Sequence, residues 1–212
     1  MYFSAAEGIL QRPILLEGIP MQTLILAGFL GAGKTTVLME LAAFLVRSGK
    51  KIVILENEIS SAGVDNQLLK SKGFQVRNIF AGCVCCTSTG ILCQDVQKIQ
   101  LEFDPDWLII EATGMAYPDA IQSSLHRELQ IDASVLALVD ASRWKRVLAA
   151  MRQFAVSQLH GAAAVLVTKI DKVDPATLNE VMHSVGEIVD HIPVLPICAI
   201  QPIPDALWST IL

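Results

Sequence analysis

The stretch Gly28–Thr35, which reads GFLGAGKT, decides the fold of this 212-residue chain because it fits the pattern G-x-x-x-x-G-K-[S/T]. The apolar run Leu24–Ala27 precedes it, and an amphipathic stretch from Thr35 to about Arg47 follows it. A strand, a glycine-rich loop and a helix in this order form the context of a phosphate-binding P-loop. The sequence therefore predicts a binding site for a nucleoside triphosphate.

The residue types of the loop match the contacts that a triphosphate needs. Glycines permit positive φ and carry no side chain, so backbone N–H groups can converge on phosphate oxygens beside the positive end of the next helix. Lys34 is expected to reach the β- and γ-phosphates, and the Thr35 hydroxyl is expected to bind Mg²⁺. The predicted nucleotide contacts in the loop are Gly28, Gly31, Ala32, Gly33, Lys34, Thr35 and Thr36.

The composition suits an α/β domain and excludes several other classes of protein. Hydrophobic residues make up 52% of the chain and charged residues 17%, which fits a sheet covered on both faces and does not fit a disordered chain. A net charge of −5 without a basic run argues against a nucleic-acid partner. No apolar run approaches the roughly 20 residues that span a membrane, and residues 1–20 do not resemble a signal peptide. We expect a cytoplasmic protein with reduced cysteines.

Short apolar runs alternate with helical patterns, which is typical of a parallel sheet built from βαβ units. The sequence predicts a doubly wound, mostly parallel, three-layer α/β/α domain over residues 21–212, preceded by a leader or extra strand at 1–20. The expected strands, after the one that precedes the loop, are 51–55, 107–110, 134–139, 163–167 and 193–197. The expected helices, after the one that follows the loop, are about 90–100, 119–128, 142–153 and 175–189.

Glu111 follows the predicted strand at 107–110, at the sheet edge where ligands gather. A carboxylate there can hold Mg²⁺ through its water shell and would be the third catalytic residue beside Lys34 and Thr35. Gly114 can bring a backbone N–H close to the γ-phosphate. The alternative is that Glu111 only caps the next helix.

Thr168-Lys169-Ile170-Asp171 is close to the Asn-Lys-x-Asp sequence that binds guanine in G proteins. Asp171 would accept hydrogen bonds from the guanine N1–H and 2-amino groups, a pair of donors that adenine lacks. The Lys169 stem would lie along the base. Thr168 stands in place of an Asn whose amide ties this loop to the P-loop, and it keeps a hydroxyl but loses that amide. The carboxylate–base pair favours GTP over ATP, and the Thr168 substitution leaves ATP open. Cys198 is expected to add a main-chain contact near the base. The alternative interpretation of Lys169 and Asp171 is an ordinary strand-end lysine followed by a surface aspartate.

Three of the five cysteines lie in the sequence Gly82–Cys86, which reads GCVCC. Extended backbone places Cys83 and Cys85 on one side, and a turn at Cys86 could add a third sulfur. Thiolates suit Zn²⁺, Cu⁺ or Co²⁺, and three protein ligands leave an exchangeable fourth position. Its candidate ligands are a histidine, water, a second subunit, Glu56 and Glu58. The alternative is a group of small buried thiols. Cys93 is expected to be a buried thiol, and each of the four histidines is more often a surface or capping residue than a ligand.

These motifs together resemble the CobW/HypB/UreG family of P-loop GTPases, and most of all its CobW-type branch. The resemblance spans about Gln22 to Ala199 and rests on six motifs: GFLGAGKTT at 28–36, Glu56-Asn57-Glu58, GCVCC at 82–86, Glu111-x-x-Gly114, Val139-Asp140-Ala141 and Lys169-x-Asp171. It implies a slow GTPase in which the nucleotide state gates a transition-metal site beside the nucleotide. It also implies a role as a metallochaperone or metal-insertion factor for a client metalloenzyme or its maturation factor, and pairing of two copies.

Three departures from the family pattern bear on that expectation. Ser61 stands where an acid is often found, Ala112 replaces a hydroxyl residue, and the usual C-terminal domain is not expected in a chain that stops at Leu212. The sequence also names no residue that would orient the attacking water. A second hypothesis therefore stays open, namely a non-catalytic, nucleotide-dependent metal buffer or sensor that reports to a partner protein.

Overall fold

The computed structural model describes residues 21–56, 75–78 and 89–212. In this part of the chain seven strands form one sheet in the order β3-β2-β4-β1-β5-β6-β7, and every pairing is parallel. The strands are β1 (Gln22–Gly28), β2 (Ile52–Glu56), β3 (Gln75–Asn78), β4 (Trp107–Glu111), β5 (Ala133–Asp140), β6 (Ala164–Thr168) and β7 (Val194–Pro196). The predicted α/β fold with a parallel sheet is confirmed.

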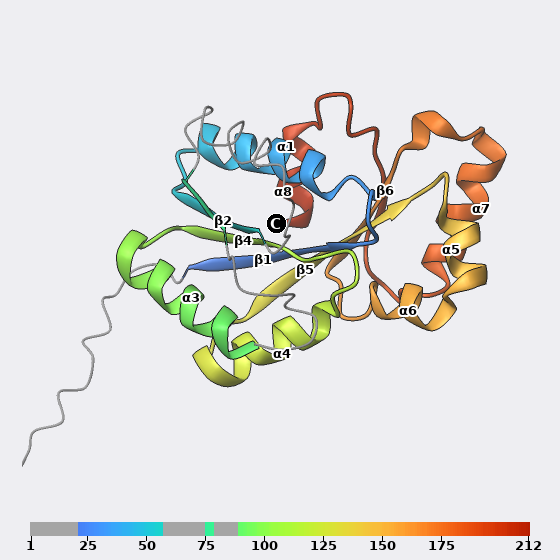
Figure 1. Cartoon of the computed structure of the whole chain (residues 1–212). Coiled ribbons are helices and arrows are strands. Elements are labelled where there is room, and N and C mark those ends of the chain that lie inside the picture. Colours follow the sequence, from blue (N-terminus) through green and yellow to red (C-terminus); the bar gives the residue numbers. More distant parts are fainter. Residues whose placement is uncertain (1–20, 57–74, 79–88) are drawn as a thin grey trace, which may run out of the picture.

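Helices cover both faces of this sheet (Figure 1). The α-helices are α1 (Lys34–Arg47), α3 (Thr89–Phe103), α4 (Pro118–Leu129), α5 (Trp144–Ala150), α6 (Arg152–Ser157), α7 (Pro175–Gly186) and α8 (Asp205–Ile211), and residues Ile170–Lys172 form a 3₁₀ turn. Side chains alternate along β1, so Leu24 and Leu26 pack with α1 and α8, whereas Ile25 and Ala27 pack with the layer of α3 to α7. The three predicted layers are present.

The central position of β1 brings the predicted site together. This strand lies between β4 and β5, and Leu26 is in register with both Glu111 and Leu136. Since parallel strands end at the same edge of a sheet, the P-loop after Gly28 lies beside Glu111, which ends β4, and near Asp140, which ends β5.

Several elements differ from those predicted. The expected helix at 142–153 is two helices, because Met151 has an extended φ of −141° and ψ of 48° that break the helical path. Helix α7 ends at Gly186, three residues earlier than expected. Strand β3 and helix α8 were not predicted, because β3 is four residues long with one apolar residue and α8 is a helix of seven residues. None of the described helices is long and apolar enough to cross a bilayer.

Candidate nucleotide site

Three glycines of the P-loop have backbone conformations that other residues avoid. Gly28, Gly31 and Gly33 have φ values of 137°, 75° and 95°. A Cβ at Gly28 would also lie 2.5 Å from the carbonyl oxygen of Leu138 on β5. Gly33 caps α1, and its carbonyl accepts the first helical hydrogen bond from the Val37 N–H at 3.0 Å. The glycines predicted from the motif therefore shape the turn from β1 into α1.

Lys34 and Thr35 lie at the start of α1, next to the end of β4. The Lys34 side chain is buried, with 7% of the residue exposed, and its Nζ donates to the carbonyl oxygens of Gly28 at 2.9 Å and Phe29 at 3.3 Å. Thr35 Oγ1 donates to Glu111 Oε1 at 3.1 Å. The structure thus joins the two predicted Mg²⁺ ligands, which are 76 positions apart in the sequence. A hydroxyl beside a carboxylate is a donor set that suits Mg²⁺.

Gly114 packs directly against the P-loop. A Cβ at this position would lie 2.4 Å from the Leu30 backbone nitrogen and 2.9 Å from its Cα. Only a residue without a side chain allows the β4–α4 loop to approach so closely. Glu111 and Gly114, which the sequence assigned to Mg²⁺ and to the γ-phosphate, are therefore both held beside the loop.

The Lys169–Asp171 loop is tied to the P-loop by two side chains. Thr168 is fully buried at the end of β6, and its Oγ1 donates to the Ala32 carbonyl oxygen at 2.7 Å. Lys169 has a left-handed φ of 56°, and its Nζ donates to the Gly31 carbonyl oxygen. The hydroxyl that Thr168 keeps thus makes a tie to the P-loop without the Asn amide, because the end of β6 lies near enough for it to reach the Ala32 carbonyl.

Asp171 and Cys198 lie together in the predicted base pocket. Cys198 follows β7, and its Sγ donates to Asp171 Oδ1 at 3.4 Å. Desolvation and the hydrogen bond to Asp171 raise the pKa of the Cys198 thiol, so the thiol stays protonated and can donate to the carboxylate. The structure thereby places the last strand end beside the residue that is expected to bind guanine.

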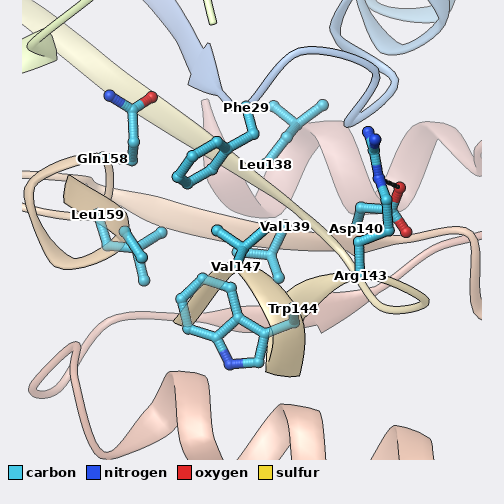
Figure 2. A pocket seen from close by; sticks show the side chains of 10 residues that line it. Phe29, Leu138, Val139, Asp140, Arg143, Trp144, Val147, Gln158 and Leu159 are labelled. Carbon is cyan, nitrogen blue, oxygen red and sulfur yellow. Dashed lines mark hydrogen bonds and ion pairs between the residues drawn. The ribbon is translucent and has the colours of Figure 1, made fainter. Parts of the chain in front are cut away.

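Asp140 and Arg143 belong to the site, although only the resemblance had drawn attention to Asp140 and nothing had to Arg143. The Asp140 carboxylate accepts from Lys169 Nζ at 2.8 Å, Arg143 Nε at 3.0 Å and Ser142 Oγ at 2.6 Å. Burial alone would raise the pKa of Asp140, but these hydrogen bonds together outweigh it and hold the pKa below its ordinary value of 3.8. Arg143 Nη2 also donates to the Leu30 carbonyl oxygen at 2.5 Å. Figure 2 shows the Asp140–Arg143 ion pair at the edge of a cavity that Phe29 also lines.

The predicted transition-metal ligands cannot be placed in the same way. Cys83, Cys85, Cys86 and Glu58 lie outside the described residues. The backbone of Glu56 ends β2 in register with Glu111. Across residues 21–56, 75–78 and 89–212, no group of three or more His, Cys, Asp or Glu side chains could hold a metal ion.

Cys93 and the histidines have the structural surroundings that the sequence indicated. Cys93 is buried in α3, and its thiol donates to the Ser124 carbonyl oxygen at 3.8 Å. The four histidines of the chain are exposed, each near a carboxylate.

The parallel sheet, the glycine loop and the Thr35–Glu111 pair define a P-loop nucleotide-binding domain. Residues 22–196 match the family described as CobW/HypB/UreG, nucleotide-binding domain. The chain belongs to this family, which is a family of P-loop GTPases.

Two curated relatives and one solved structure show how far the similarity extends. The chain is 35% identical over 166 residues to the zinc chaperone YjiA of Escherichia coli K12, covering 72% of this chain and 50% of YjiA. It is 31% identical over 142 residues to zinc-regulated GTPase metalloprotein activator 1 of Dictyostelium discoideum, covering 60% of this chain and 28% of that protein. The chain thus spans half or less of the length of these relatives. The hydrogenase maturation factor HypB of Archaeoglobus fulgidus shares the fold with a TM-score of 0.65 at 15% identity, over 90% of this chain and 87% of HypB.

Proposed function

We propose that this chain binds GTP with Mg²⁺, hydrolyses it slowly, and uses the nucleotide state to gate a transition-metal site for a client metalloprotein. The observation that carries the proposal is the backbone register of Glu56 with Glu111. Neighbouring strands lie about 4.8 Å apart. The backbone of Glu56, the first residue of the expected metal site, thus ends β2 beside the end of β4, where Glu111 hydrogen-bonds Thr35.

The residues around the P-loop have distinct roles in this proposal. Lys34 and the loop amides bind the phosphates, and the Thr35 hydroxyl and Glu111 carboxylate would hold Mg²⁺, which neutralises phosphate charge when bound. Asp171 selects guanine, while Thr168 and Lys169 keep its loop at a fixed position against the P-loop carbonyls. The proposal of a metal cargo is supported by the related protein YjiA, which is named a zinc chaperone.

Base selection is tested by comparing GTP and ATP in equilibrium titrations of the wild type and of Asp171→Asn. The wild type should prefer GTP by at least tenfold, because adenine has no donor pair for the Asp171 carboxylate. The variant should lose most of that preference and keep its weaker affinity for ATP. Equal affinity of the wild type for both nucleotides would contradict the guanine assignment.

Coupling to metal is tested by chelator competition with Zn²⁺ and with Co²⁺ on the reduced protein. Affinity should be measured without nucleotide, with Mg·GDP, with a non-hydrolysable Mg·GTP analogue and with its ATP counterpart. A shift of tenfold or more, equal to about 1.4 kcal/mol, with the GTP analogue alone supports the gate. Equal affinity in all four states would mean that the two sites are uncoupled.

A triple variant, Cys83→Ser, Cys85→Ser and Cys86→Ser, tests the predicted ligands in the same assay. It should lose tight metal binding and keep nucleotide binding, because hydroxyl groups are poor ligands for soft metals. Metal affinity that survives in the triple variant would contradict the thiolate site.

Phosphate release by the wild type distinguishes the gated GTPase from the sensor. The sensor would show the shift in metal affinity without GTP turnover.

A further inference from the structure

Gln158, which follows α6, joins two loops of the nucleotide site through a single buried amide. Only 2% of the residue is exposed. Its Oε1 accepts from the Gly28 backbone N–H at 3.2 Å, and its Nε2 donates to the Ala116 carbonyl oxygen. Gly28 begins the P-loop, and Ala116 lies in the β4–α4 loop, two residues after Gly114.

One helical turn before Gln158, two aromatic pairs made by Phe154 also link the P-loop to the β4–α4 loop. Phe154 of α6 meets Phe29 with ring centroids 5.2 Å apart at 87°, and Tyr117 at 5.4 Å and 90°. Edge-to-face pairs of this kind are favourable contacts. Residues 154 and 158 lie on the same side of the helix because they are four positions apart. The helix therefore contacts two consecutive residues of the P-loop and two consecutive residues of the β4–α4 loop.

The P-loop is joined to the end of β4 by the Thr35–Glu111 hydrogen bond and to the β4–α4 loop by Gln158. Between these contacts Gly114 packs against the Leu30 backbone. Figure 2 shows Gln158 near the Phe29 ring, beside the cavity that also contacts Leu138 and Trp144. An amide buried this deeply keeps its two loops at a fixed separation, because losing either partner would leave a buried polar group unpaired.

We propose that Gln158, supported by Phe154, is a positioning residue that fixes the β4–α4 loop against the P-loop. This inference rests on the proposed GTPase function, since it gives the contact a role in holding Glu111 and Gly114 at the terminal phosphate. Gln158 has no catalytic role in this proposal. It acts through the two backbone groups that it joins.

The variant that tests this role is Gln158→Met, which has a similar volume and makes neither hydrogen bond. Its matched control is Gln122→Met, because Gln122 Nε2 likewise donates to a backbone carbonyl, that of Ala133 at 2.6 Å. Ala133 starts β5, at the opposite end of the strand from the site. The control thus removes a comparable bond outside the nucleotide site.

Each protein is assayed for thermal midpoint, for kcat and KM of GTP hydrolysis, and for affinity toward GDP and a non-hydrolysable GTP analogue. Gln158→Met should lower kcat at least tenfold and lower the preference for the GTP analogue over GDP at least tenfold, while GDP affinity changes less than threefold. KM for GTP should rise together with the loss of GTP-analogue affinity, because KM approaches Kd when hydrolysis is slow. Gln122→Met should leave kcat and this preference within twofold of the wild type. If Gln158→Met lowers only the thermal midpoint, as its control does, the positioning role is wrong.

Phe154→Leu leaves the Gln158 amide in place and provides a second test if Gln158→Met does not fold. It should lower the same preference about threefold, and an unchanged preference would overturn the proposal. Failure of the proposed function would appear differently, as a wild type that does not hydrolyse GTP. The nucleotide preference of the variants would still decide whether Gln158 positions the loop.

Discussion

One hydroxyl group, on Thr168, and one carboxylate, on Asp140, connect the ends of β6 and β5 to the P-loop. Thr168 reaches the Ala32 carbonyl with one oxygen, and Asp140 gathers Lys169 and Arg143, which in turn bond P-loop carbonyls. The lowered pKa of Asp140, in which hydrogen bonds outweigh the effect of burial, extends its anionic state below its ordinary value of 3.8. The Lys169–Asp171 loop and the P-loop are thus held together by a few polar side chains.

Replacing Thr168 with valine should lower the free energy of unfolding by about 1–3 kcal/mol, because the shape is kept while the buried Ala32 carbonyl loses its donor. Urea unfolding measures the difference. The matched control is Thr210→Val, where an exposed hydroxyl on α8 donates to the Ala206 carbonyl oxygen at 2.9 Å. The control should stay within about 0.5 kcal/mol of the wild type. Equal effects of the two changes would contradict a special role for Thr168.

Asp140 makes stability depend on pH in a defined direction. Its pKa is lower in the folded protein than its ordinary value of 3.8, so its charge stabilises the fold above that pH, and the contribution disappears as the pH falls below it. Urea unfolding of the wild type and of Asp140→Asn should show a wild-type advantage that is constant from about pH 6 to 5 and shrinks toward pH 3. An advantage that grows with acidity would show that the sign is wrong.

The P-loop motif predicted Lys34 and Thr35, and strand ends predicted Glu111 and Lys169, because each of these residues lies at a fixed offset from a local pattern. Arg143 and Gln158 could not be found in this way. Their partners, Leu30 and Gly28, are 113 and 130 positions away, so their contacts exist only after the strands have assembled. An acid at the end of a strand, followed by an arginine three residues later, was the available signal for Asp140 and Arg143.

At the scale of the elements, buried strands were predictable because their apolar runs are long enough to show burial on both faces. The break between α5 and α6 was not, because it depends on the backbone of Met151 and no Pro or Gly marks it. Helix α8 escaped prediction for a different reason. Trp208 has no exposed surface and anchors the helix by stacking on Phe44 of α1. The sequence of a seven-residue helix does not predict such a tertiary contact.

The approach of the β4–α4 loop to the P-loop should be sensitive to a single added carbon at Gly114. Gly114→Ala places a Cβ 2.4 Å from the Leu30 nitrogen, so the two loops must separate. Affinity for a non-hydrolysable GTP analogue should fall at least tenfold, and affinity for GDP should fall less.

Gly186→Ala is the control for that titration, because a Cβ at Gly186 meets nothing within 4 Å. This change at the end of α7 should leave both affinities unchanged and stabilise the fold by up to about 1 kcal/mol. Equal losses for GDP and the GTP analogue in Gly114→Ala would show that the contact supports the P-loop alone.

For the whole molecule, nucleotide binding should shift the folding equilibrium, because the site is assembled from strand ends across the sheet and does not exist in the unfolded chain. At about 100 times Kd, Mg·GTP should add about 2.7 kcal/mol, or roughly 5–10 °C in the thermal midpoint. Lys34→Ala should abolish the shift. Lys98→Ala, which removes a lysine that is 58% exposed on α3, should keep it. A shift retained by Lys34→Ala would place the nucleotide elsewhere.

The position of Trp144 has an optical consequence. Its indole lines the same cavity as Phe29 of the P-loop, and it is one of three tryptophans in the chain. The other two, Trp107 and Trp208, belong to the start of β4 and to α8. A chain carrying Trp107→Phe and Trp208→Phe would thus emit from one indole close to the phosphate loop. Its fluorescence would follow nucleotide exchange in real time, with no dye attached to the protein or to the nucleotide.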